Sequence, residues 1–227
     1  LEQRPFSYEI GRPFQKISHE LFKASAWSSV GTSGKFTLNL ARQYNLREEY
    51  DKYFNLSANN GDSSPELNYE ITSKSAELLW DHKMNSKISG LIGLNFMHQA
   101  NTFEGRMFIP NYESLNTGFF ITEKWLAGDF SIESGIRVDF RNLDVFMRRN
   151  AEVVKDPYDY RALSGMLSGK WEPTDSTSVL LSISTGWRPP GVNELYSNGL
   201  HHGSASVEIG NKDLNEERSI GANFSIT

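Results

Sequence analysis

The sequence predicts an all-β protein, and more specifically an antiparallel transmembrane β-barrel. Three observations lead to this fold class. Apolar and polar residues alternate along almost the whole chain, short and long connections follow one another strictly, and tryptophans recur just before the short connections. Alternation with a period of two is typical of strands whose two faces meet different surroundings. No window keeps an apolar stripe at helical spacing.

Four segments alternate most clearly, at residues 35–47, 129–140, 177–187 and 219–226. In the first, Phe36 and Leu38 face one way and Thr37 faces the other; in the third, Ile183 and Trp187 share the apolar face. Weaker strands are expected near residues 15–28, 70–82, 86–101, 114–126, 159–172 and 204–209, which gives about ten strands.

The connections sort into two kinds along the chain. Short ones lie near residues 29–34, 82–87, 127–129 and 173–176, and long ones near 50–68, 102–113, 147–158 and 188–215. A soluble sandwich has no reason to sort its loops in this way, because water surrounds both of its ends. A membrane barrel does sort them, with tight turns on the periplasmic side and long loops outside.

Four of the five tryptophans precede the four short turns. They are Trp27, Trp80, Trp125 and Trp171. On a barrel they would form a periplasmic aromatic girdle, since an indole has an apolar ring and an N–H that reaches water or headgroups. The alternative is that each one is an ordinary core aromatic.

The composition of the 227 residues excludes several classes of protein. A net charge of −5 argues against a nucleic-acid partner, which needs a concentrated basic face. There is no cysteine, so thiolate chemistry and disulfides are absent. No apolar run reaches the roughly 18–20 residues of a membrane-spanning helix. No catalytic, metal-site or phosphate-binding motif is found either. We therefore expect no enzyme activity, no catalytic residue, no cofactor and no protein-bound metal.

The segment from Thr185 to Leu214 carries the most specific resemblance to a known family. Trp187–Pro190 reads WRPP and is similar to the FRAP-like box of TonB-dependent outer-membrane receptors, and Asn211–Leu214 reads NKDL and is similar to their NPDL-like box. The segments 9–26, 41–51 and 135–140 also resemble recurring barrel segments of this family.

The resemblance implies a barrel of roughly twenty-two strands with an N-terminal plug inside it. It also implies a place in the outer membrane of a Gram-negative bacterium, in contact with its lipid, and uptake of a scarce nutrient driven by the TonB complex through the plug. An iron–siderophore, haem or other metal complex is the favoured ligand. Residues 1–227 then correspond to the middle of the barrel, incomplete at both ends and without the plug. A passive porin-like or structural barrel and a soluble carbohydrate-binding β-sandwich remain as alternatives.

Candidate ligand-binding residues lie in two long loops. The first set is Arg188, Glu194, Tyr196, His201 and His202, and the second is Tyr53 and Phe54. In haem receptors of the family a histidine between the two boxes contacts the haem iron, so the resemblance allows this role for His201 or His202. Relatives that carry no haem share a similar stretch, however, and hydrogen bonding within the loop is the favoured interpretation of the pair. Arg188 either guides an anionic ligand or braces the loop through a salt bridge.

Overall fold

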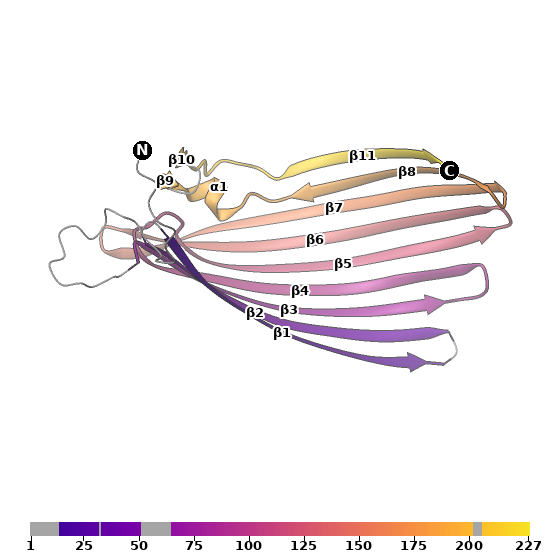
Figure 1. Cartoon of the computed structure of the whole chain (residues 1–227), viewed down its shortest axis with the longest axis horizontal. Helices are drawn as coiled ribbons and strands as arrows, with labels where there is room; N and C mark the ends of the chain where they lie inside the picture. Colours follow the sequence, from indigo (N-terminus) through magenta and orange to yellow (C-terminus); the bar gives the residue numbers. More distant parts are fainter. Residues whose placement is uncertain (1–13, 32, 51–64, 202–205) are drawn as a thin grey trace, which may run out of the picture.

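The chain forms a nine-stranded antiparallel sheet in the order β1 to β8 followed by β11 (Figure 1). The computed structural model describes residues 14–31, 33–50, 65–201 and 206–227. The strands of this sheet are β1 (Phe14–Val30), β2 (Gly34–Tyr50), β3 (Leu67–Lys83), β4 (Ile88–Gly105), β5 (Asn111–Ala127), β6 (Phe130–Arg149), β7 (Glu152–Thr174), β8 (Thr177–Arg188) and β11 (Glu217–Ile226).

Between β8 and β11 the chain makes a small separate unit. It consists of α1 (Val192–Tyr196) and of the paired strands β9 (Asn198–His201) and β10 (Ser206–Ile209). The expected strand near 204–209 therefore exists, but it belongs to this unit and not to the main sheet. Within the described part of the chain, no helix has the length and apolar character needed to cross a membrane.

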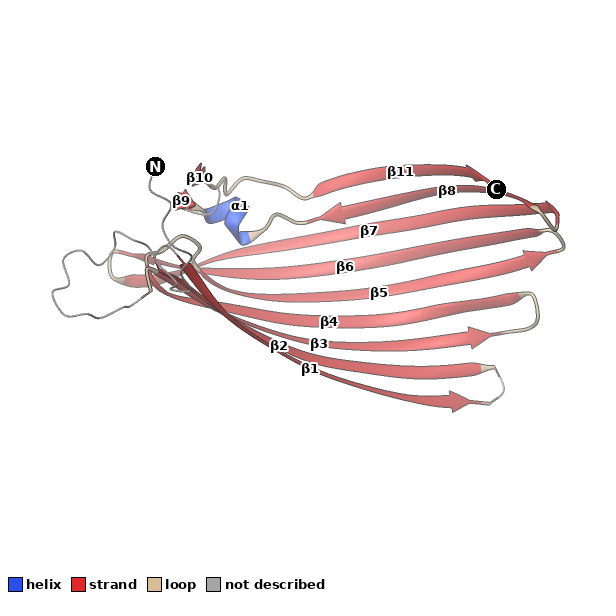
Figure 2. Ribbon diagram, in the orientation of Figure 1, coloured by secondary structure: helices blue, strands red, loops and turns tan. Residues whose placement is uncertain are grey.

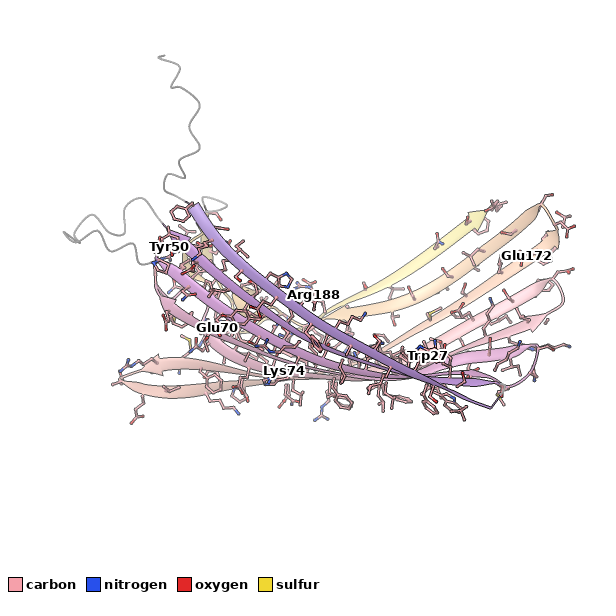
Figure 3. All side chains as sticks on the ribbon, turned by 60° about the horizontal axis from the view of Figure 1, so that its bottom comes forward. Trp27, Tyr50, Glu70, Lys74, Glu172 and Arg188 are labelled. Carbon is pink, nitrogen blue, oxygen red and sulfur yellow. The ribbon has the colours of Figure 1, made fainter. Side chains whose placement is uncertain are left out.

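The sheet is a single curved layer, open between β1 and β11 (Figure 3). Tight links join β3 to β4, β5 to β6 and β7 to β8 at one end, which we call the turn end (Figure 2). The opposite end, called the loop end, carries α1, β9 and β10. The all-β antiparallel prediction is confirmed.

Two of the four expected long loops are shorter than predicted. Residues 147–158 are almost entirely strand, because β6 and β7 meet at a two-residue turn, Asn150–Ala151. Both turn residues have positive φ, 50° and 67°, as a tight hairpin requires. Residues 102–113 likewise shrink to a link at 106–110. The strict alternation of short and long links was therefore wrong at these two places, since polar strand residues were taken for loop.

The two faces of the sheet differ in chemistry over its turn-end half. Direct register partners share a face, and one such row is polar: Ser25, Asn39, Glu77, Asn95, Gly118 and Asp139. The adjacent row, on the other face, is apolar: Ala26, Leu38, Leu78, Leu94, Phe119, Val138 and Leu163. We call the face of the first row the inner face and that of the second the outer face.

The outer face is not a protein core. Phe36, Ile132 and Ile183 are 38%, 42% and 52% exposed, so they do not pack together in a dry centre. An apolar face of this size is not left to water in a soluble sandwich. The single layer thus contradicts the carbohydrate-binding sandwich and fits a wall with lipid on one side.

The tryptophans near the turns divide between the two faces. Trp80, Trp125 and Trp171 share the outer face, because their register partners are Phe36, Ile132 and Phe130. Trp27 pairs with Thr37 and lies on the inner face, under the ammonium of Lys35 at 5.5 Å from the ring centroid. The girdle therefore stays a prediction for three tryptophans, and Trp27 does not lie with them.

Candidate ligand-binding site

The loop between β8 and β11 folds against the inner face of the sheet. One face of α1 presents Val192, Leu195 and Tyr196, which pack with Leu143 and Val145 of β6 into a buried cluster. Leu143 and Val145 are fully buried. Burial of these apolar side chains stabilises the docked loop. The loop is therefore fixed to the sheet at its loop end and is not a free connector.

Arg188 braces the start of this loop. Its guanidinium donates to both carboxylate oxygens of Glu194, at 2.7 and 2.9 Å, and to Glu217 at 3.0 Å. Glu194 also accepts the backbone N–H of Gly191 at 2.6 Å. These hydrogen bonds, that from Arg188 first, lower the pKa of Glu194 to about 2. The arrangement ties the end of β8 to α1 and to β11.

Tyr196 is held by a second polar group on β7. Its hydroxyl donates to Asp156 Oδ2 at 3.0 Å and lies 2.8 Å from the hydroxyl of Tyr158. The ammonium of Lys212 binds the same Asp156 oxygen at 3.1 Å and lies 4.4 Å from the Tyr196 ring centroid. Burial, followed by the bonds to Tyr158 and Asp156, raises the pKa of the Tyr196 phenol. Tyr196 is thus a packing and anchoring residue.

The link between β4 and β5 covers the neighbouring part of the inner face. Phe108 is buried against Leu67 and Tyr69 of β3. The backbone N–H of Ile109 donates to the Tyr69 hydroxyl at 3.1 Å. Asn101 donates from its side chain to the Pro110 carbonyl at 3.3 Å. Short as it is, this link is fixed to the wall.

A cavity of about 360 Å³ lies where these two covering segments meet the wall. Its residues come from β2 to β5, from the 106–110 link, from α1 and from β10. They include the polar residues Asn45, Arg47, Glu49, Asn101, Asn193 and Glu208, and the aromatic residues Tyr69, Phe108 and Tyr112. Arg47 pairs with Glu49 through its terminal nitrogen. Arg47 Nε is buried and has no hydrogen-bond partner among the described residues. The cavity therefore offers an unsatisfied donor beside amides and aromatic rings.

A polar network lies beside this cavity on the inner face, on the side of the turn end. Arg137 donates to Asp139 at 2.7 Å and to Asn95 at 3.1 Å, and Trp187 Nε1 donates to Asp139 at 3.2 Å. A side chain at Gly118 would collide with all three groups of the Arg137 network, because an added Cβ there would lie 2.2 to 2.6 Å from them. Glycine at this position makes the network possible.

The contact of Trp187 with Asp139 corrects its expected place on the apolar face. The register pairs of β7 and β8 stop at Met166 and Ser184. Beyond them, the Thr185 hydroxyl accepts the Gly165 N–H at 2.9 Å in place of a backbone carbonyl. The strand separates from β7 there, although it stays paired with β11 through Arg188, and the Trp187 indole reaches Asp139 on the inner face.

The comparison with known families decides what this wall belongs to. The model of the TonB dependent receptor-like β-barrel family matches residues 5–227. The chain belongs to this family. Its members are transport receptors of the Gram-negative outer membrane and not enzymes.

Solved structures have the same barrel fold. The copper transporter OprC superposes with a TM-score of 0.73 at 16% identity, over 92% of this chain and 36% of that one. The FrpB iron transporter from Neisseria meningitidis (F3-3 variant) gives 0.68 at 15%, over 94% and 34%. The hemophore receptor HasR of Serratia marcescens, a double mutant in complex with its hemophore HasA and heme, gives 0.55 at 14%, over 95% and 40%. The chain thus spans only about a third of the first two of these receptors.

The receptor barrel brings only some of the sequence-predicted site residues together. Arg188 and Glu194 form a direct ion pair, which supports the brace and not a ligand contact. Tyr196 is buried and points to β7. For His201 the structure gives the backbone, paired with Ser206 in the β9–β10 ribbon. His202, Tyr53 and Phe54 lie outside the described residues.

The residues around the cavity were missed from the sequence. Alternation had already placed Asn45 and Arg47 on the polar face of their strand. The missing step was that two distant segments, 106–110 and the α1 unit, cover that face at the loop end. Apolar residues at inner-face positions, such as Leu143, could have predicted the covering segments, because a large apolar side chain is usually buried by another part of the chain.

Proposed function

We propose that the chain is the central wall of an outer-membrane barrel that takes up a small metal complex. An iron–siderophore is the favoured ligand, with haem or another metal chelate as the alternatives within this class. The rest of the barrel and the plug would belong to the same protein outside these residues. The plug would connect to the TonB complex, which supplies the energy.

The cavity at the loop end is the observation that carries this proposal. Its volume of about 360 Å³ lies within the usual range for small-molecule sites. Amide and guanidinium groups can donate to the hydroxyl and carboxylate oxygens of a chelator, and rings such as those of Tyr69 and Tyr112 can cover its apolar parts. The Nε of Arg47 supplies a donor that no described residue satisfies.

Several structural neighbours favour a metal complex over other nutrients. They include a copper transporter, an iron transporter and the ferric yersiniabactin uptake receptor FyuA from Yersinia pestis. The receptor HasR adds a complex with heme. Their low identity to this chain leaves the choice among these ligands to experiment.

Replacing Arg47 tests the cavity directly. In the full-length receptor, Arg47→Gln should weaken binding of the transported complex about tenfold, as expected for the loss of one charge-assisted hydrogen bond. Arg42→Gln is the matched control, because Arg42 lies on the same strand but on the exposed outer face. Binding is measured by fluorescence titration with a panel of ferric siderophores, haem and copper chelates.

Uptake by cells completes the test. A strain lacking the receptor should lose growth on one metal complex, and growth should return with the Arg42→Gln receptor and remain impaired with Arg47→Gln. Uptake should also stop when the TonB complex is removed. Uptake that continues without it would favour the passive porin, and equal binding by both variants would remove the cavity from the proposal.

A further inference from the structure

The outer face carries an ionisable pair close to the turn end. His82 of β3 and Glu123 of β5 lie on this face. Their register partners are Gly34 and Ser134, which belong to the outer-face sets of β2 and β6. The two residues meet across β4, with His82 Nε2 at 2.9 Å from Glu123 Oε1. Such a pair is unexpected on an otherwise apolar face.

Gly90 on β4 makes the meeting possible. An added Cβ there would lie 2.7 Å from the His82 ring and 2.8 Å from the Glu123 carboxyl carbon. It would also lie 2.3 Å from the backbone carbonyl of Thr122, which cannot move aside easily. Because Gly90 has no side chain, there is space over β4 for the two side chains to meet.

Two polar atoms of the pair are buried and unsatisfied. The His82 side chain is only 9% exposed and that of Glu123 is 37% exposed. His82 Nδ1 and Glu123 Oε2 have no hydrogen-bond partner within the described residues. In this contact His82 Nε2 donates and Glu123 Oε1 accepts, because a carboxylate has acceptors only. The free Glu123 Oε2 therefore requires a donor.

An apolar groove begins at the same glutamate. Glu123 and Ser134 line one end of a hollow of about 520 Å³, which continues away from the turn end along the outer face. Its outer-face residues include Ile121, Ile136, Gly165, Leu167 and Ile183, and it also reaches Gly135, Met166 and Ser184 of the inner rows, where β7 and β8 begin to separate. Gly165 has no side chain to fill it. The groove has the character of a site for an acyl chain, and Trp80 and Trp125 lie on the same face near the turns.

We propose that this site binds phosphatidylethanolamine from the leaflet on the turn side of the membrane. The primary ammonium of the headgroup has N–H donors and a positive charge, which match the free Oε2 and the negative charge of the Glu123 carboxylate. One acyl chain lies in the groove over Gly165. A phosphatidylcholine headgroup has no N–H to donate, and phosphatidylglycerol has no cation.

Lipid titration followed by native mass spectrometry tests the site on the full-length receptor in detergent. Three lipids with the same acyl chains are compared: phosphatidylethanolamine, phosphatidylcholine and phosphatidylglycerol. The unaltered receptor should bind one phosphatidylethanolamine about tenfold more tightly than either of the other two. Equal binding of phosphatidylcholine, or tighter binding of phosphatidylglycerol, would overturn the proposal, and neither comparison needs a variant.

Two variants separate the headgroup from the chain. Glu123→Gln removes the charge and should abolish the preference for phosphatidylethanolamine over phosphatidylcholine. Gly165→Val fills the groove and should weaken all three lipids alike; its Cβ meets only the Gly135 carbonyl, at 3.4 Å, so the barrel can accommodate it. Thr117→Ala, on the outer face of β5 away from the site, is the control and should change nothing.

The inference rests on the proposed outer-membrane location and not on the transported ligand. A receptor that binds phosphatidylethanolamine but carries no metal complex would leave it standing. Unchanged headgroup preference in the Glu123→Gln receptor would refute it, whatever the receptor transports.

Discussion

The turn-end and loop-end halves of the sheet place their apolar side chains on opposite faces. On β6, Ile136 and Val138 of the turn-end half lie on the outer face and Arg137 on the inner face. Beyond Phe140 the pattern is inverted, because Leu143 and Val145 lie on the inner face and are fully buried. One strand with unbroken pairing to both neighbours thus has two hydrophobic patterns.

β3 shows the same inversion. Leu78 is on the outer face and Glu77 on the inner face in the turn-end half. Toward the loop end, the outer face carries Lys74 and Glu70 (Figure 3), whereas Tyr69 on the inner face is buried under Phe108. The inversion is therefore a property of the wall and not of one strand.

The difference shows that each face follows the medium it meets. In the proposed membrane location, acyl chains would meet the outer face in the turn-end half, where apolar residues cost nothing and charges are expensive. In the loop-end half, water would meet the outer face. There, α1 and the 106–110 link cover the inner face and bury its apolar residues. The level of the inversion, near Phe140 on β6, thus marks the proposed upper limit of the lipid.

The largest effect is expected at the covered inner face. Leu143→Ala removes a fully buried side chain from the α1 cluster and should cost about 3–5 kcal/mol of docking free energy for the loop, because the rigid wall cannot close the cavity. Hydrogen exchange of the α1 amides in the full-length receptor measures it.

Leu163→Ala on the outer face of β7 provides the comparison. Leu163 is 66% exposed on the outer face, and in the proposed membrane location fluid acyl chains would fill the space that its side chain leaves. Its effect on any amide should be well below that of Leu143→Ala. Similar effects of the two changes would mean that the loop is not docked on the inner face in solution.

A smaller effect is expected from charge on the two levels of the outer face. Ile136→Arg puts a guanidinium among acyl chains and should lower the free energy of unfolding by about 2–4 kcal/mol. Asn142→Arg, on the same face of β6 but above the inversion, should be nearly neutral, since Asp159 is its cross-strand partner. Denaturant unfolding from lipid vesicles gives both values. Equal costs would place the lipid boundary elsewhere.

The sequence was sufficient to predict the strands of the sheet, but not the two segments that cover its inner face. Alternation identified the main strands and placed Phe36 and Ile132 on the outer face. It succeeded because the residues of each of these strands alternate between a polar face and an apolar face. The alternation pattern gave wrong strand limits in the loop-end half, where the apolar residues move to the inner face. Polar residues at 147–158 look like a loop because water meets the outer face there, although they are paired strand.

The cavity needed information that no local pattern contains. Asn45 and Arg47 on β2 meet Phe108 and Asn193 only after two segments distant in sequence fold onto the wall. The contact between His82 and Glu123 was missed for a similar reason, since the two residues lie on β3 and β5 with Gly90 between them. Arg188 and Glu194 were found because they are close in sequence, but their contact is structural.

The smallest effect concerns acid release of the docked loop, which the turn-end half should not show. Hydrogen bonds from Arg188 lower the pKa of Glu194 to about 2 from an ordinary value of 4.5. The carboxylate therefore adds its full stabilisation above about pH 4.5 and loses it as the pH falls toward 2. A fluorophore on a cysteine replacing the exposed Asn198 should report loosening in this range, because the 227 residues contain no other cysteine. In Glu194→Gln the step should become smaller, since Asp156 and Glu217 also hold the loop, while Glu172→Gln at the turn end should leave it unchanged. An unchanged step in Glu194→Gln would show that Glu194 does not contribute to the acid release.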